Sequence, residues 1–158
     1  MTWQAVLPLL LLMPVLCAVA WNDLRHMRIP NLLVGIAVGL FVLCTPLLGW
    51  SEIAWRLGAA VTVFALGTAA FALRLVGGGD VKMLAALMLF VPPQTLTLFG
   101  YAFSVALVLG VLFVMALRIA RVFRNSDLVG IRARGKFPMG ISIALAGLFQ
   151  LALITPPI

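Results

Sequence analysis

The chain has 158 residues, of which 65% are hydrophobic and only 9% are charged, and its mean hydropathy is +1.23. This composition excludes an ordinary soluble globular protein. We therefore expect a single transmembrane domain over residues 1–158, embedded in a lipid bilayer. The net charge of +7 is explained by membrane topology and requires no nucleic-acid partner.

Apolar stretches of about the length that crosses a bilayer, roughly 20 residues, recur along the chain. They predict an all-α, polytopic membrane protein with about six transmembrane helices. The fourth stretch is short, so we expect a short or tilted helix, or one that extends through Pro92 and Pro93. The six predicted segments are residues 4–21, 31–49, 53–73, 81–91, 95–117 and 138–154.

The distribution of Lys and Arg predicts the orientation of these helices. Arg56 is the only basic residue outside the links that follow the first, third and fifth segments. The positive-inside rule makes those links cytoplasmic and places both termini outside. The long link at residues 118–136 mixes apolar and basic residues and predicts an interfacial helix or loop, with Asp127 as a counter-charge.

Asp23 and Asp80 are the strongest candidates for a functional site. The chain has only four acidic residues, and a charge at the centre of a transmembrane helix costs about 2.5–3.5 kcal/mol. Asp23 follows the first apolar segment and Asp80 precedes the fourth, so both are expected at the cytoplasmic edge. Their shared position predicts a two-carboxylate site for acid–base chemistry. The simpler alternatives are a polar turn at Asp23 and a helix cap at Asp80.

Several neighbours of the aspartates are expected to support the site. Three consecutive glycines before Asp80 tolerate positive φ and let an extended substrate approach closely. Pro30 and Asn31 mark the start of the second helix. Arg28 and Lys82 are either anchors at the lipid headgroups or contacts for a substrate. Cys17 and Cys44 form no Cys/His cluster, so no metal site is indicated. The supporting set is Gly77, Gly78, Gly79, Lys82, Arg28, Pro30 and Asn31.

Two motifs carry a family resemblance. Asp-x6-Pro-Asn begins at Asp23, and Gly-x-Gly-Asp-Val-Lys begins at Gly77. Together they resemble the prepilin peptidases, which are membrane aspartic proteases of the Gly-x-Gly-Asp type. The stretch Phe-Pro-Met-Gly-Ile-Ser-Ile-Ala at residues 137–144 is also similar to the start of that family's last helix.

The resemblance implies an aspartic endopeptidase of a bacterial cytoplasmic (inner) membrane. Its partner would be a pilin-like precursor with a short basic leader followed by a hydrophobic helix, and it would remove the leader at the cytoplasmic face. The chain has neither an added cytoplasmic region nor a Cys-x-x-Cys motif, which resembles the compact enzymes that serve Flp-type (tight-adherence) pili. We therefore expect a peptidase without methyltransferase activity and without cofactors such as S-adenosylmethionine.

Hydrolysis by two carboxylates requires one ionised and one protonated group. Asp80 is expected at the start of a helix and Asp23 after the end of one, so the helix dipoles predict Asp80 as the base and Asp23 as the acid. Arg25 and Arg28 oppose this assignment. The alternative functions are a small transporter or channel subunit, with aspartates that bind a cation or relay protons, and a non-enzymatic scaffold of a secretion machine.

Overall fold

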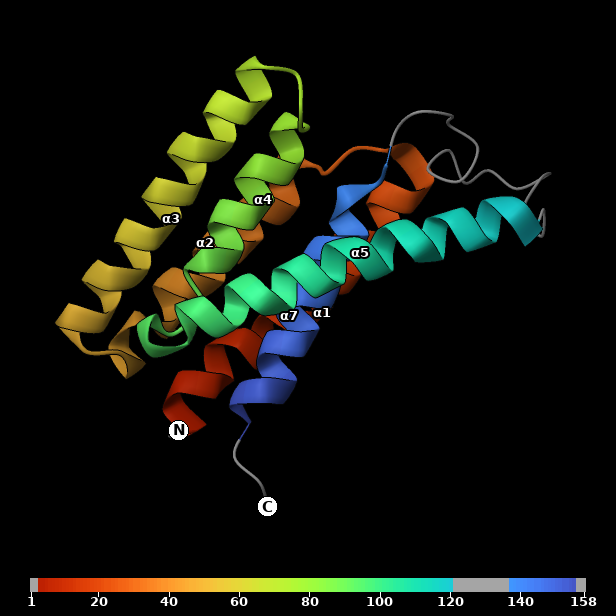
Figure 1. The fold of residues 1–158 in the computed structure, drawn as a ribbon. Helices are drawn as coiled ribbons and strands as arrows, with labels where there is room; N and C mark the ends of the chain where they lie inside the picture. Colours follow the sequence, from red (N-terminus) through yellow and green to blue (C-terminus); the bar gives the residue numbers. More distant parts are fainter. Residues whose placement is uncertain (1–2, 121–136, 156–158) are drawn as a thin grey trace.

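The computed structural model describes residues 3–120 and 137–155 of the chain. Over these ranges the chain forms helices and short connections without a strand, which confirms the all-α prediction. Most of the link at residues 118–136, including Asp127, lies outside the described residues. Each predicted apolar segment corresponds to one helix (Figure 1): α1 Trp3–His26, α2 Asn31–Cys44, α3 Trp50–Ala72, α4 Gly78–Met88, α5 Leu96–Ala120 and α7 Met139–Ile154.

The helices differ in whether they can cross a membrane. Within residues 3–120 and 137–155, three stretches are both long and apolar enough to do so, namely Val6–His26, Trp50–Ala72 and Pro93–Ile119. Asn31–Leu47 and Met139–Ile154 are apolar but shorter. With 11 residues, α4 is only about 16 Å long, roughly half of the bilayer core. It ends before Pro92 and Pro93, which lead into a separate 3-10 turn, Pro93–Thr95. Six membrane spans and outside termini remain predictions.

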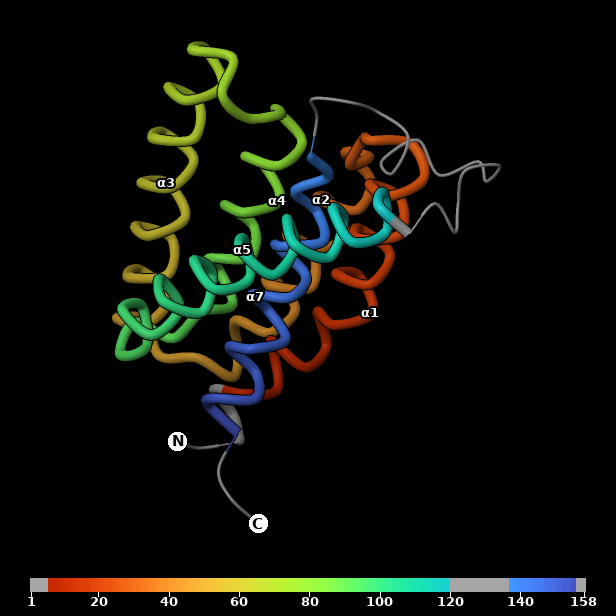
Figure 2. The backbone as a smooth tube through the Cα atoms, turned by 45° about the vertical axis from the view of Figure 1, so that its right-hand side comes forward, coloured from red at the N-terminus to blue at the C-terminus, as the bar shows by residue number. Residues whose placement is uncertain are grey.

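Two groups of helices meet around α4. In one group, α7 packs against both α1 and α5; in the other, α4 packs along α3. The two groups are joined because α4 also contacts α2 and α7, and α2 contacts α1. Figures 1 and 2 show α3 and α4 side by side, with α5 running obliquely across the bundle. Since α4 is apolar nearly all round, it is enclosed by its neighbours, and most of its side chains are buried.

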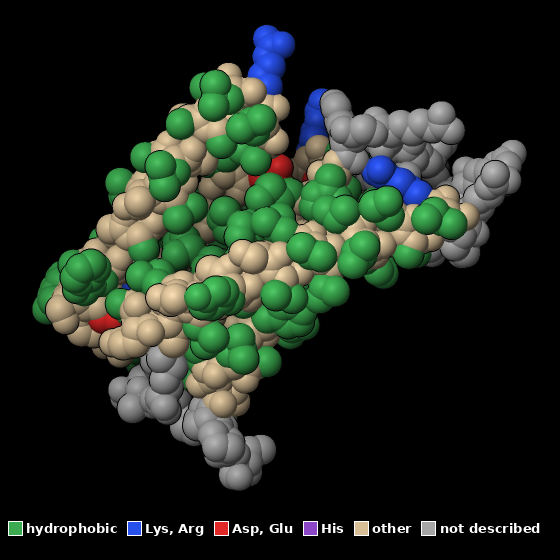
Figure 3. Space-filling model, viewed as in Figure 1, with side chains coloured by type: hydrophobic (Ala, Val, Ile, Leu, Met, Phe, Trp, Pro, Cys, Tyr) green, Lys and Arg blue, Asp and Glu red, His purple; other side chains and the backbone are tan. Residues whose placement is uncertain are grey.

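Much of the outer surface is apolar. On α3, for example, Val61 is 66% exposed and Leu66 is 68% exposed, and Trp50 at the start of the helix is 88% exposed. Hydrophobic side chains also cover most of the face seen in Figure 3, with basic side chains near one end. Soluble monomers rarely expose contiguous apolar surface of this extent, whereas lipid covers it in a bilayer. The structure therefore supports a membrane protein.

Arg56 fixes the C-terminal end of α4. Its side chain is completely buried, although α3 as a whole is largely exposed. The guanidinium pairs with Glu52 one turn earlier, at 2.6 Å from Nη2 to Oε1, and Nη1 donates to the carbonyl oxygen of Leu89 at 3.1 Å. Leu89 is the C-cap of α4, where the helix leaves unpaired carbonyls and a cation is favourable. One arginine thus joins α3 to α4 and satisfies a buried carbonyl.

Arg56→Met is expected to lower the stability of the fold. The change leaves Glu52 without its cation and the Leu89 carbonyl without its donor, at a cost of about 3 kcal/mol. For a chain of this size the unfolding temperature in detergent should fall by about 6–12 °C, measured by circular dichroism. Arg74→Met, at an exposed arginine, is the control and should change it little. Equal unfolding temperatures for the two variants would contradict this role of Arg56.

Candidate active site

Asp23 is buried in the last turn of α1, with only 4% of its surface exposed. The sequence predicted that Asp23 follows the first helix, and this was wrong, because α1 continues to His26. Its carboxylate accepts a hydrogen bond from the backbone N–H of Gly140, at 2.6 Å from Oδ2. Gly140 lies in the first turn of α7, where free N–H groups and the helix dipole favour an anion. The last helix of the chain therefore stabilises a negative charge on the first.

Gly140 must be a glycine for this contact to form. A Cβ atom at this position would lie 2.8 Å from Cβ of Asp23 and 2.9 Å from its Oδ2. Both distances are below ordinary contact, so a larger residue would push α7 away from α1. The sequence marked this stretch only through its family resemblance and did not connect Gly140 with Asp23.

Asp80 occupies the third position of α4, after the N-cap Gly77. The Gly77 backbone hydrogen-bonds to the Asp80 carboxylate, as in the return contact of a capping box. The expected capping role is thus present, but at the third helical position rather than at the N-cap. The other carboxylate oxygen, Oδ1, is buried and has no hydrogen-bond partner among the described residues. A helix-capping role therefore accounts for the hydrogen bonding of only one of the two carboxylate oxygens.

Close packing explains why glycine occupies positions 77–79 in this structure. A Cβ at Gly77 would lie 2.5 Å from Oδ2 of Asp80, and one at Gly79 would lie 3.2 Å from Cβ of Ile29. None of the three has a positive φ here, although the sequence analysis allowed for one. Their lack of side chains lets the start of α4 pack beside the segment that follows α1. Approach of a substrate to the same glycines remains a prediction.

Both aspartates line one cavity of about 280 Å³. Of the predicted supporting residues, the three glycines and Arg28 also line it, whereas Pro30, Asn31 and Lys82 do not. Lys82 instead donates a hydrogen bond to Oδ1 of Asn31 at 3.1 Å, which joins α4 to the start of α2. The cavity therefore contains two carboxylates beside a backbone almost free of side chains.

Met27 and Ile29 also line this cavity, and the sequence analysis missed them. Met27 has a φ of 52°, in the left-handed region that non-glycine residues rarely adopt. This conformation ends α1 directly after its last turn and places Met27 beside the carboxylates. No sequence pattern marked it, because glycine is the residue that usually occupies such a position.

The two carboxylates influence each other. Burial, and then the negative charge of Asp23, raise the pKa of Asp80 to about 6, while the hydrogen bond from Gly77 opposes the rise. Like charges in one poorly solvated site favour a shared proton over double ionisation. The arrangement can therefore hold one proton near neutral pH and supply both an acid and a base.

Asp80→Asn is expected to stabilise the protein at high pH more than at low pH. The folded state holds the Asp80 proton between pH 3.8 and about 6, whereas the unfolded chain does not, so wild-type stability falls as the pH rises through this range. Asparagine does not ionise, so the variant does not lose stability over this pH range. At pH 8 the variant should gain about 2 kcal/mol relative to wild type, after allowance for partial exposure of the side chain.

Thermal unfolding in detergent at pH 4 and pH 8 measures this difference. Asp127→Asn serves as the control, because it makes the same chemical change in the predicted counter-charge of the link at residues 118–136. A gain for Asp80→Asn that is the same at both pH values, or a loss at pH 8 alone, would contradict the raised pKa.

Comparison with known proteins identifies the family. The sequence model of the type IV leader peptidase family matches residues 10–120, which include both aspartates and more than half of the chain. Comparison with curated proteins and with solved structures gives no match. The matched region ends before Gly140, so the contact between α7 and Asp23 is an observation of this structure alone. The chain belongs to the type IV leader peptidase family.

Proposed function

We propose that this protein is a membrane aspartic endopeptidase that removes the basic leader of pilin-like precursors at the cytoplasmic face. Family membership supports a leader peptidase in general. The observation that carries the aspartic mechanism is that Asp23 and Asp80 line the same cavity. The family match also favours a peptidase over a transporter subunit that relays ions. Cleavage without N-methylation, as in the compact enzymes of Flp-type pili, is part of the proposal.

We assign the proton to Asp80 and the base role to Asp23, which reverses the expectation from the sequence. That expectation required Asp23 to lie beyond a helix C-terminus, but the N-terminus of α7 donates to it instead. Charge-assisted hydrogen bonds of this kind stabilise the ionised carboxylate. Asp80 has a buried, unpartnered Oδ1, which favours the neutral form. The contacts of the two side chains, and not only the helix ends, therefore decide which one is charged.

Hydrolysis would then proceed by addition of water to the scissile carbonyl. Asp23 accepts a proton from the attacking water, while Asp80 donates its proton to the carbonyl oxygen as the C–O bond forms. The tetrahedral intermediate collapses with cleavage of the C–N bond. The proton taken up by Asp23 passes to the leaving amine, and the carbonyl re-forms as its hydroxyl returns a proton to Asp80. Both carboxyl groups end in their starting states.

Asp23→Asn and Asp80→Asn should each abolish leader removal from a co-expressed precursor. Loss of a positioned acid or base lowers the rate by about 10²–10⁴-fold, because the amide can neither accept nor donate the required proton. Immunoblotting of the precursor measures cleavage, and mass spectrometry of the product shows whether its new amine is unmethylated. Asp127→Asn is the matched control and should process normally. Normal processing by either active-site variant would end the aspartic mechanism.

The rate of processing in detergent is expected to fall as the pH rises above about 6, when Asp80 loses its proton. In the complex with substrate, exclusion of water would raise the pKa of Asp80, whereas the positive charge of the leader would lower it. The pH dependence of kcat/KM measures the free enzyme directly. ¹³C NMR of labelled aspartate, with each Asn variant used for assignment, identifies the group that titrates. A higher pKa for Asp23 than for Asp80 would refute the assignment of the proton.

A further inference from the structure

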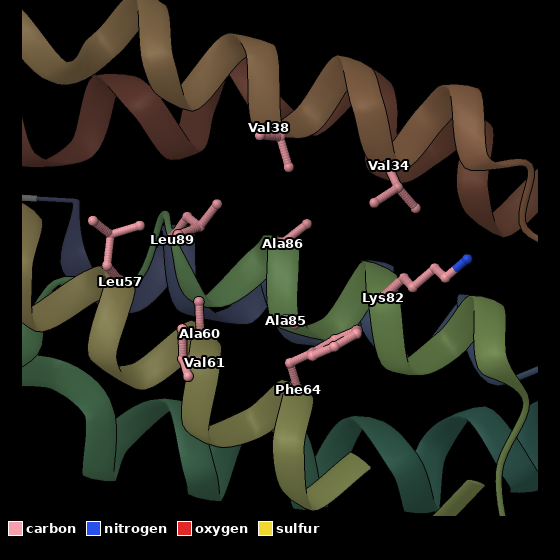
Figure 4. A pocket seen from close by; sticks show the side chains of 10 residues that line it. All are labelled: Val34, Val38, Leu57, Ala60, Val61, Phe64, Lys82, Ala85, Ala86 and Leu89. Atoms are coloured by element: carbon pink, nitrogen blue, oxygen red, sulfur yellow. The ribbon is translucent and has the colours of Figure 1, made fainter. Parts of the chain in front are cut away.

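A second cavity, of about 280 Å³, lies between α2, α3 and α4 (Figure 4). Residues of one face of each helix line it: Val34 and Val38 on α2 are four apart, and Leu57, Val61 and Phe64 on α3 follow the spacing of a single helical stripe. On α4 the lining includes the small residues Ala85 and Ala86. We call this cavity the α2–α3 groove. Larger side chains thus form its two walls, and small ones form part of its base.

The groove is apolar except at one end. Among the described residues that line the groove, Lys82 is the only charged one, and its ammonium group donates a hydrogen bond to Asn31. Apart from this end, the groove offers an occupant van der Waals contact but no charge. Such a site suits an apolar chain that lies parallel to the helices. Small residues at its base allow the backbone of another helix to approach closely.

The groove begins close to the active-site cavity along both α4 and the start of α2. On α4, Asp80 lines the active-site cavity, and Lys82, two residues later, lines the groove. On the other side, Ile29 lines the active-site cavity and Val34, near the start of α2, lines the groove. The two linings share no residue, and the hydrogen bond from Lys82 to Asn31 joins α4 to α2 at this end of the groove. One substrate could therefore contact both sites.

We propose that the α2–α3 groove binds the apolar helix that follows the cleavage site of the precursor. This inference rests on the proposed function, because only a substrate cut at the carboxylates must extend into the adjoining groove. The polar leader would remain at the open end of the active-site cavity, and the apolar segment would pack against α2, α3 and α4. The groove would thereby select precursors by the helix that follows the leader.

Val61→Trp tests the proposal, since it adds bulk to a groove residue that is already 66% exposed and so disturbs the core little. Leu66→Trp is the matched control, because Leu66 is 68% exposed on the same helix but does not line the groove. Two synthetic probes are compared: a basic leader joined to an apolar helix of about 20 residues, and the same leader ending shortly after the scissile bond.

For Val61→Trp, the ratio of kcat/KM for the long probe to that for the short probe should fall about tenfold, as apolar contact is lost. For Leu66→Trp the ratio should match wild type. Equal ratios in the two variants would overturn the groove proposal and leave the proposed function intact. Failure of wild type to cleave either probe would instead overturn the proposed function.

A cross-link provides a second test that does not require cleavage. The background for this test is an inactive Asp23→Asn chain in which both native cysteines are removed by Cys17→Ala and Cys44→Ala. In this background, Val38→Cys places a thiol in the groove, and Leu43→Cys places one on α2 outside the groove. The long probe carries one cysteine in its apolar helix. Disulfide formation should be several-fold greater with Val38→Cys. Equal or absent formation would show that the groove does not hold the helix of the precursor, as when lipid fills it.

Discussion

The hydrogen bond from Gly140 to Asp23 is the contact on which the site depends most. It joins residues 117 positions apart and brings the N-terminus of α7 to the last turn of α1. A carboxylate as enclosed as Asp23 would be costly without such a donor. Once Asp23 is stabilised as an anion, its charge opposes ionisation of Asp80, so the difference between the two carboxylates begins with this backbone contact. Glycine at position 140 therefore serves both the packing of α7 against α1 and the stabilisation of the Asp23 carboxylate.

The short helix α4 carries the second carboxylate and is fixed at both ends. At its N-terminus the Gly77 backbone hydrogen-bonds to Asp80, and at its C-cap the positive charge of Arg56 opposes the helix dipole. These polar contacts complement the apolar packing that surrounds the middle of the helix. Because α4 contacts α2, α3 and α7, it sets the position of Asp80 relative to the rest of the bundle. A helix too short to span the bilayer thus positions the second carboxylate of the cavity.

The sequence predicted the helices well and the contacts between them poorly. Runs of apolar residues located each of the described helices to within a few residues at most ends, since burial in lipid or protein requires such runs. The end of α1 was missed because Asn22 and Asp23 interrupt the apolar pattern, which normally indicates a helix terminus. In the structure Asp23 stays helical since α7 supplies its hydrogen-bond donor. Spacing along one chain cannot reveal such a partner, and it likewise gave no sign of Met27.

Unfavourable local features gather at the end of the bundle that carries the carboxylates. Oδ1 of Asp80 has no hydrogen-bond partner among the described residues. Met27 and Arg74 adopt left-handed conformations just after the ends of α1 and α3. Each such backbone conformation costs of order 1 kcal/mol in a non-glycine residue. Burial of Asp80 beside Asp23 adds a further cost near neutral pH. The apolar core and the Arg56 contacts lie toward the middle and the opposite end of α4, where they can offset these costs without contacting the reacting groups. A fold arranged in this way keeps two carboxylates in the lining of one cavity, although burial and mutual repulsion disfavour their joint ionisation.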